Sequence, residues 1–475
     1  MTDHNTYVSP LETRYAGKDM RTLFGDQKKF STWRRLWLEL ARCQKELGLN
    51  IRDEQIAQMQ ARLDEIDFAT AAEYERKFRH DVMAHIHTFG DAAPAARGII
   101  HLGATSQYVN DNTDLLLMRE GMNLLIGLLV NVVAALAEVA RRHRDTACLA
   151  FTHFQPAQLT TVGKRATLWC QDFLMDLREL EHRIDTLEFR GVKGTTGTQA
   201  SFLALFDGDH EKVKRLDRMV ADRFGFAKLC PVTGQTYSRK IDAAVAACLG
   251  GIGASVHKFC NDIRLLAHRR EIEEPFEADQ IGSSAMAYKR NPMRCERATG
   301  LARWLIGICT QPLQTAAEQW FERTLDDSAN KRLAIPETFL TADACLRIVL
   351  NVTQGLVVRK PVIARNVHAA LPYMATENIL MAATQAGGDR QELHERIRVH
   401  SLAAAERENQ GLPNDLMDRL QNDAVVARVG FDAVMNERNY IGRSPEQVDE
   451  FLTEHVAPVL KKYTEKLGQK SELNV

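Results

Sequence analysis

Apolar residues recur along most of the chain at the spacing of helices, and the alternating patterns typical of strands are few. Steps of four and three residues form the seam between helices that pack nearly parallel or antiparallel. We expect the clearest such helix to begin near Pro156, because proline is tolerated in a first turn. Similar stretches cover residues 240–270 and 296–320. The seam of the first helix runs from Ala166 through Cys170, Phe173, Leu177, Leu180, Ile184 and Leu187.

The most apolar stretch, residues 121–137, contains seventeen residues without a charge. It is shorter than the roughly 20 residues that span a bilayer, and it contains two asparagines. The pattern therefore predicts a helix buried inside a large bundle and no membrane span.

These patterns predict an all-α fold of three helical domains, at residues 1–105, 106–358 and 359–475. The central domain carries the longest helices, and the last has shorter elements interrupted by ENQGLPNDL. Long buried helices in a soluble chain often continue their seam into another subunit. We therefore expect a homo-oligomer built on a helical bundle.

Composition excludes several classes of protein. The net charge of −1 over 475 residues gives no field that recruits nucleic acid or a membrane, so any anion site is local. Nine cysteines occur without a C-x-x-C pair, which favours reduced thiols in a cytoplasmic protein. No apolar signal segment opens the chain. The Gly-rich segments KGTTGTQASF and LGGIGASVHK lack the spacing of P-loop and dinucleotide motifs.

Three segments contain candidate chemistry but leave alternatives open. RHDVMAHIHTFG, residues 79–90, is either a helix with hydrogen-bonded histidines, a metal site or a substrate-contacting cluster, and the first is preferred to metal; His80 and His87 are expected on one face. His153 lies before Pro156 at an expected loop-to-helix junction and suits proton transfer, although a single histidine is more often structural. WFERTLDDSANKR, residues 320–332, could be only a salt-bridged helix face.

The segment QIGSSAMAYKRNPMRCER concentrates small and basic residues. Asn291 and Pro292 are expected as N-cap and first residue of a helix. Arg294 and Arg297 then fall in its first turns, where cations oppose the helix dipole. This arrangement favours an anion shared by the helix end and the guanidinium groups.

The segment GSSAMAYKRNP resembles the signature of the fumarase/aspartase superfamily, whose members eliminate fumarate from succinyl-type substrates. The segments SPLETRYAG, RHDVMAHIHTFG, IIHLGATS, FTHFQPAQLTTVGKR, VKGTTGTQASF, TGQTYSRK and QWFERTLDDSANKR narrow the resemblance to the adenylosuccinate lyase family, above all its animal-type branch. The resemblance covers almost the whole chain from residue 9.

The resemblance implies cleavage of adenylosuccinate to AMP and fumarate, and of the succinylocarboxamide ribotide SAICAR to AICAR and fumarate. It implies no metal or organic cofactor. It also implies a homotetramer with a core of long central helices, in which three subunits contribute to each active site.

The resemblance also assigns residues to roles. His153 matches the general acid that protonates the departing nitrogen, and Ser283 matches the base. Glu296 is assigned to positioning His153. The catalytic set is His153, Ser283, Lys289, His80 and Glu296. The substrate contacts are Arg14, Tyr15, Arg79, His80, Asp81, Thr105, Ser106, Gln235, Asn291, Arg297, Arg323, Ser328 and Arg332.

One position departs from the signature, because Ala287 stands where proline is usual. Proline would restrict the open loop, so the substitution concerns loop rigidity and not the class of reaction. Two other functions stay open. One is another fumarate-releasing lyase such as argininosuccinate lyase, against which RHD and TGQTYSRK argue. The other is a catalytically silent structural relative, against which the intact His153, Ser283 and Lys289 argue.

Overall fold

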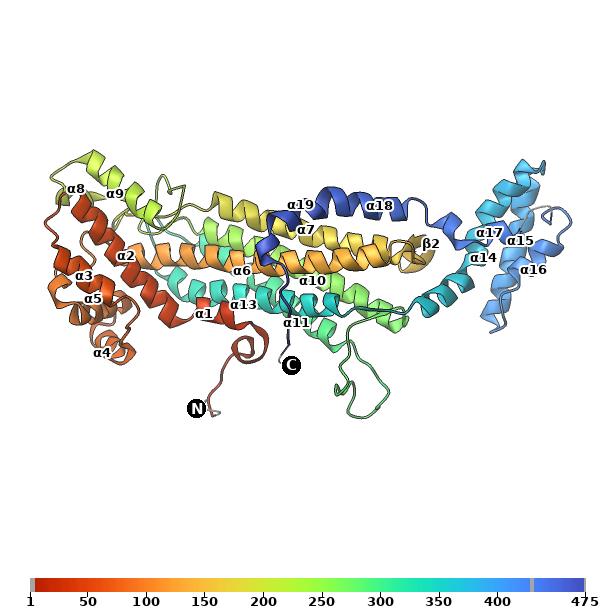
Figure 1. Cartoon of the computed structure of the whole chain (residues 1–475), viewed down its shortest axis with the longest axis horizontal. Coiled ribbons are helices and arrows are strands. Elements are labelled where there is room, and N and C mark those ends of the chain that lie inside the picture. The colour runs from red at the N-terminus through yellow and green to blue at the C-terminus, as the bar shows by residue number, and fades with distance from the viewer. Residues whose placement is uncertain (1–4, 428–430, 474–475) are drawn as a thin grey trace.

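The computed structural model describes residues 5–427 and 431–473. Long helices lie roughly side by side along the long axis of the molecule (Figure 1). The bundle contains α6 (Ser106–Arg142), α7 (Val162–Thr186), α10 (Lys240–His268), α11 (Met293–Ile308) and α13 (Asp326–Gln354). The predicted helical fold with long central helices is confirmed.

Further helices cover the two ends of the bundle (Figure 1). One end carries α2 (Asp26–Glu46), α3 (Asp53–Ala61), α4 (Phe68–Phe78), α5 (Asp81–Ala92), α8 (Ala200–Leu205) and α9 (His210–Arg223). The other end carries α14 (Lys360–Gln385), α15 (Arg390–Asn409), α16 (Leu416–Asn422) and α17 (Phe431–Val434). The last helices, α18 (Ser444–Phe451) and α19 (Ala457–Lys462), return along the bundle.

Short elements connect these helices. The helices η1 (Leu11–Tyr15), α1 (Lys18–Leu23), η2 (Pro94–Ala96), α12 (Gln311–Ala317), η3 (Glu437–Tyr440), η4 (Leu452–Val456) and η5 (Thr464–Lys466) each span at most seven residues. The strands β1 (Ala147–Thr152) and β2 (Gln155–Thr161) form an antiparallel hairpin. The short strands β3 (Ile272–Glu273) and β4 (Val357–Val358) also pair antiparallel, although α11, α12 and α13 lie between them in the sequence.

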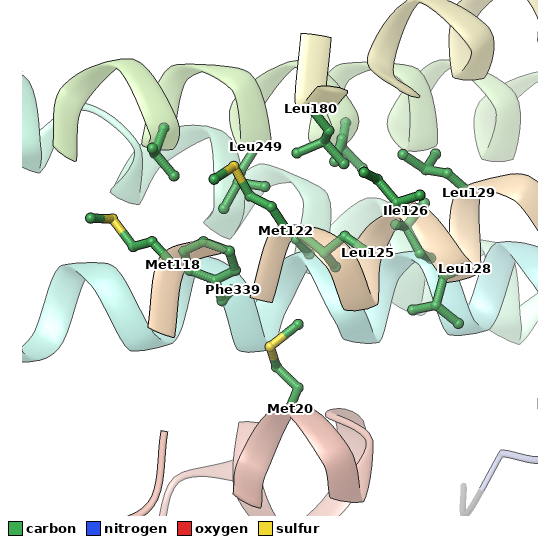
Figure 2. Close-up of a cluster of buried hydrophobic side chains, with 14 of the residues drawn as sticks. Met20, Met118, Met122, Leu125, Ile126, Leu128, Leu129, Leu180, Leu249 and Phe339 are labelled. Carbon is green, nitrogen blue, oxygen red and sulfur yellow. The ribbon is translucent and has the colours of Figure 1, made fainter. Parts of the chain in front are cut away.

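The core of the bundle forms around α6. Met122, Leu125 and Leu129 of this helix are fully buried and face neighbouring helices (Figure 2). The seam of α7 is also buried from Cys170 to Leu180, as its spacing predicts. Helices α6 and α10 are long and apolar enough to cross a membrane, but both pack within this bundle as core helices. The stretch at residues 121–137 is therefore a buried helix, as predicted.

Two predicted helix starts are wrong. Helix α7 begins at Val162, because Pro156 lies in β2 and the hairpin precedes the helix. Helix α11 begins at Met293 with Pro292 as its N-cap, one residue later than expected. A second buried cluster, centred on α14 and α15, is separate from the main core. The division into three domains at residues 105 and 358 stays a prediction.

Candidate active site

His153 occupies the tip of the β1–β2 hairpin. Thr152 pairs with Gln155, so His153 and Phe154 form a two-residue turn. Their φ angles are 53° and 58°, the left-handed geometry of the turns that best fit a twisted hairpin. The expected loop-to-helix junction is therefore wrong. The hairpin instead holds an exposed histidine at its tip.

At the opposite end of α6, three predicted substrate contacts meet from three segments. Thr105 is the N-cap residue of α6, directly before Ser106. The Gln235 amide nitrogen donates to Thr105 Oγ1 at 2.8 Å, and Arg323 Nη1 donates to Gln235 Oε1 at 3.2 Å. We call Thr105, Gln235 and Arg323 the contact cluster.

A set of fully or nearly buried charges lies beneath the contact cluster. Asp111 accepts from the Tyr237 amide at 2.9 Å, from Arg239 Nη2 at 3.0 Å and from Lys331 Nζ at 3.3 Å. Arg239 also pairs with Asp327 at 2.6 Å. Burial opposes ionisation of Asp111, but the charges of Arg239 and Lys331 outweigh it and lower the pKa of this carboxyl. We call Asp111, Arg239, Asp327 and Lys331 the buried ion network.

Two further side chains connect this network to the contact cluster. Arg190, fully buried, donates to the Gln235 carbonyl through Nη2 at 2.7 Å. Gln107, with its amide oriented to satisfy its hydrogen bonds, donates to Asp111 at 2.9 Å and accepts from Arg323 at 2.6 Å. Asp111 thereby orients a group that directly contacts the Arg323 guanidinium.

Sequence reasoning missed Asp111, Arg190, Arg239 and Gln107. The available signal was charge within apolar helical stretches: Asp111 precedes the most apolar part of α6, and Arg239 directly precedes α10. Charged residues are almost never fully buried unless they are paired, so such positions predict a network but not its partners.

The RHD segment joins the same end of the molecule. Arg332 of α13 pairs with Asp81 at 2.6 Å. His80 is the N-cap residue of α5 and accepts from the Met83 amide at 3.3 Å, so the expectation that His80 and His87 share a helix face is wrong. Arg79 ends α4 in left-handed geometry. The segment therefore lies where one helix ends and the next begins, beside α13.

The remaining histidines of this segment have packing roles. His85 is buried and stacks on Phe30 with ring centroids 3.6 Å apart. Burial lowers the pKa of His85 to about 4, so the ring is neutral at pH 7. His87 packs against Phe78 at 4.8 Å. Across residues 5–427 and 431–473 no group of three or more His, Cys, Asp or Glu is placed to hold a metal ion.

The charges of residues 320–332 pair with distant segments more than with one another. Asp327 pairs with Arg239 and Arg332 with Asp81. Within the segment, Arg323 lies 3.6 Å from Asp327. A simple salt-bridged helix face is therefore the wrong interpretation, and the segment is a junction between α13 and the rest of the site.

Arg14 and Tyr15 lie in η1, which packs against α13. Arg297 of α11 lies close enough to both that they shift its pKa. Burial is the main cause that lowers the pKa of Arg297, Tyr15 opposes the shift and Arg14 adds to it. Three predicted contacts therefore gather where η1, α11 and α13 meet.

The signature loop, residues 280–292, extends from the bundle before α11 (the green loop below the bundle in Figure 1). Ser283 Oγ accepts from the Met286 amide at 3.1 Å and more weakly from Ala285 at 3.4 Å. Amide donors aimed at this oxygen favour negative charge on it. Ser283 is half-buried, whereas Ser284 and Lys289 are exposed.

The two ends of the loop approach each other closely. Asn291 Nδ2 donates to the Gly282 carbonyl at 2.8 Å. A Cβ atom at Gly282 would lie 2.1 Å from the Lys289 carbonyl oxygen, so only glycine allows this approach. Asn291 therefore has a role in closing the loop on itself.

The expected anion site at the start of α11 is already filled. Both carboxylate oxygens of Glu274 accept from its first free amides, Arg294 at 3.0 Å and Cys295 at 2.9 Å. Arg294 is buried and pairs with Glu277 at 2.6 Å. The predicted anion is thus a carboxylate of the same chain, and Arg294 is structural. Glu296 is exposed and makes no hydrogen bond or ion pair with His153 within the described part of one chain.

His153 and the contact cluster lie far apart in one subunit. The 37 residues of α6 separate the cluster from the hairpin, which corresponds to about 55 Å of helix. Figure 1 shows β2 and α5 at opposite ends of the bundle. One chain therefore assembles the contact cluster but leaves His153 without it.

Comparisons with known proteins identify the family. Residues 46–307 match the family model described as "Lyase", and residues 372–451 match "Adenylosuccinate lyase C-terminus". The adenylosuccinate lyase of Saccharomyces cerevisiae is 52% identical, with 100% of each chain covered. That of Schistosoma mansoni is 48% identical, also with 100% of each covered.

Solved structures share the fold. Fumarate lyase from Mesorhizobium sp. BNC1 gives a TM-score of 0.80 at 24% identity, over 95% of this chain and 100% of that one. The 3-carboxy-cis,cis-muconate lactonizing enzyme from Pseudomonas putida gives 0.82 at 20%, over 96% and 99%. At these identities the likeness concerns the fold alone.

Proposed function

The chain belongs to the adenylosuccinate lyase family, and we propose that it carries out the family's C–N cleavage at active sites shared between subunits. It is a soluble enzyme of purine biosynthesis with adenylosuccinate lyase activity. The full-length identity of 52% to the yeast enzyme carries this conclusion. Cleavage of SAICAR to AICAR, the absence of a cofactor and a cytoplasmic location are part of the proposal.

In the proposed reaction, Ser283 removes the proton from the carbon next to a succinyl carboxylate. The electron pair left on that carbon forms an aci-carboxylate, then the double bond of fumarate as the C–N bond breaks. His153 gives its proton to the departing nitrogen. The amides of Ala285 and Met286 support the charge on Ser283, and Lys289 adds a cation once the loop closes.

A shared site is supported by the separation of its parts. His153 lies in the exposed turn between β1 and β2, and Ser283 lies in the signature loop, while the contact cluster lies at the start of α6. The bundle also exposes large apolar side chains that a single chain leaves uncovered. They are Leu168, Met175, Leu265, Trp304, Ile306, Leu313 and Leu333. We propose that copies of the chain cover them in a homotetramer whose core is the central domain.

The function is tested by fumarate release from the purified protein. We expect release from adenylosuccinate and from SAICAR, and none from argininosuccinate. Release from argininosuccinate alone would replace the proposed substrate class. No release from any of the three would support a catalytically silent relative.

The shared site is tested by mixing two inactive proteins. His153→Ala and Ser283→Ala homotetramers should each be inactive, because every site lacks one group. After joint unfolding and refolding, some sites combine His153 of one chain with Ser283 of another. We expect activity to return and to peak near equal amounts. Verified mixed tetramers that stay inactive at every ratio would contradict the shared site.

A further inference from the structure

A cavity of about 250 Å³ lies beside the first turns of α13, between that helix and α2. Two predicted substrate contacts, Ser328 and Arg332, line it. The cations Lys331 and Lys29 line it as well, and Lys29 comes from α2, a helix to which the sequence motifs assign no site residue. The cavity thus gathers three cations and a serine hydroxyl, together with the carboxylates of Asp26 and Asp114.

Two of the three cations already have carboxylate partners. Lys331 pairs with Asp114 at 2.5 Å and with Asp111 at 3.3 Å. Arg332 pairs with Asp81 at 2.6 Å. Within the described part of the chain, Lys29 Nζ has no carboxylate within ion-pair distance and no hydrogen-bond acceptor. The Ser328 hydroxyl likewise has no hydrogen-bond partner there.

The surroundings of Lys29 explain how it is held but do not neutralise it. Its ammonium group lies over the rings of Phe30 and Trp33, at 5.1 Å and 5.2 Å from their centroids. Burial is the main cause that lowers its pKa, and Arg332 adds to this effect. Asp114, Asp81 and Asp26 act in the opposite direction, but only from beyond pairing distance. A desolvated ammonium without a partner is a costly arrangement unless an anion arrives.

We propose that Lys29 contacts an anionic group of the nucleotide substrate, alongside Ser328 and Arg332. The inference rests on the proposed function for the identity of that substrate. Adenylosuccinate offers a phosphate and succinyl carboxylates, which share the oxyanion chemistry that this cavity fits. A phosphate has enough oxygen atoms to take the hydroxyl and two cations at once.

Substitution of Lys29 by methionine keeps the apolar stem over the rings and removes the charge. We expect Lys29→Met to raise KM for adenylosuccinate on the order of 10-fold or more, as for a lost charge-assisted hydrogen bond. Lys29→Arg should recover part of the loss. Lys28→Met is the matched control, because Lys28 is the preceding residue of α2 and pairs with Glu120 at 2.8 Å.

Three compounds distinguish a contact to the phosphate from a contact to a succinyl carboxylate: AMP, adenosine and the substrate that lacks the phosphate. If Lys29 contacts the phosphate, the variant should weaken AMP binding by calorimetry and should bind adenosine as the wild type does. It should also cleave the nucleoside lacking the phosphate as the wild type does. If KM rises by the same factor on that nucleoside as on adenylosuccinate, and AMP binding is unchanged, the contact is to a succinyl carboxylate.

Lys29→Met that matches Lys28→Met in KM and AMP affinity would overturn the proposal. A change in melting temperature alone, with KM and AMP affinity unchanged, would also overturn it. The AMP titration needs no turnover. A wild type that binds AMP through Lys29 but releases no fumarate would sink the proposed function and leave the Lys29 contact standing.

Discussion

The contact cluster and the signature loop differ in how far one chain completes them. Beneath the cluster, Asp111 and Arg239 have essentially no exposure, and their charges are matched within the subunit. In the loop, residues 284–290 are all exposed, and Ser283 is held mainly by amides of its own turn. A single chain therefore completes the predicted substrate-contact end and leaves the signature loop open.

The difference follows from what each region must do. A buried ion pair is weak evidence for stability, because desolvation offsets the attraction. Here the buried ion network instead orients the predicted contacts. Gln107 links Asp111 to the guanidinium of Arg323, and Arg190 holds the Gln235 carbonyl. The loop must instead admit substrate and then exclude water, which a rigid network would prevent.

The largest effect should come from the loop. We expect Ser283→Ala to lower kcat on the order of 10²–10⁴-fold, because a positioned proton acceptor is lost. Ser284→Ala is the matched control, since Ser284 is exposed and should change kcat only a few-fold. Steady-state fumarate release measures both. An inactive Ser284→Ala beside an active Ser283→Ala would assign the base to the second serine.

A smaller loss should come from the buried ion network. Each carboxylate oxygen of Asp111 accepts from a different donor. Asparagine has only one such oxygen, so Asp111→Asn places an NH₂ group against either the Tyr237 N–H or Arg239. We expect folded Asp111→Asn to lose on the order of 10²-fold in kcat/KM, as for a misplaced contact. Loss of the Asp111 charge should also cost stability, at most about 3–5 kcal/mol, because Arg239 keeps Asp327 and Lys331 keeps Asp114 as partners.

The control for that variant is Asp217→Asn. Asp217 is also buried and pairs with Lys193 at 2.5 Å, and it contacts none of the predicted substrate residues. It should lower the melting temperature but keep kcat/KM of the folded protein within about twofold, as for a site outside the reacting geometry. Asp111→Asn that melts lower yet retains full kcat/KM would reduce the network to a structural role.

Sequence periodicity was sufficient for the bundle, because a buried seam such as that of α7 repeats within a single helix. It failed at the hairpin, where two non-glycine residues at positive φ leave no strong turn signal around His153. It also failed at the start of α11, where the capping anion Glu274 comes from twenty residues earlier. Local patterns contain no information about such distant partners.

The site shows the same limit. Motif resemblance supplied the candidate substrate contacts, and the structure brings three of them, Thr105, Gln235 and Arg323, together. It could not supply Asp111 or Arg190, because their roles depend on pairing across 128 and 45 residues of sequence. Lys29 could not be predicted for the same reason, because only the folded chain places it in one cavity with Ser328 and Arg332 of α13.

The smallest effect should come from restoring the proline at position 287. The Lys289 amide donates to the Met286 carbonyl at 3.0 Å, so Ala287 is the first central residue of a β-turn, where proline is favoured. Its φ is not positive, and its amide donates no hydrogen bond among the described residues. Ala287→Pro should therefore stabilise the loop by about 0.4–1 kcal/mol through the entropy of its open state.

We expect Ala287→Pro to keep its activity and to resist proteolysis at residues 282–292, measured as the rate of nicking. Ala285→Pro is the contrasting variant, because it removes the amide that donates to Ser283 Oγ at 3.4 Å. It should lower kcat although it also adds a proline to the loop. A large loss in Ala287→Pro would show that the closed loop leaves this β-turn. The open geometry at residues 286–289 would then be the resting state, and closure would have to remake the turn before Ser283 can act.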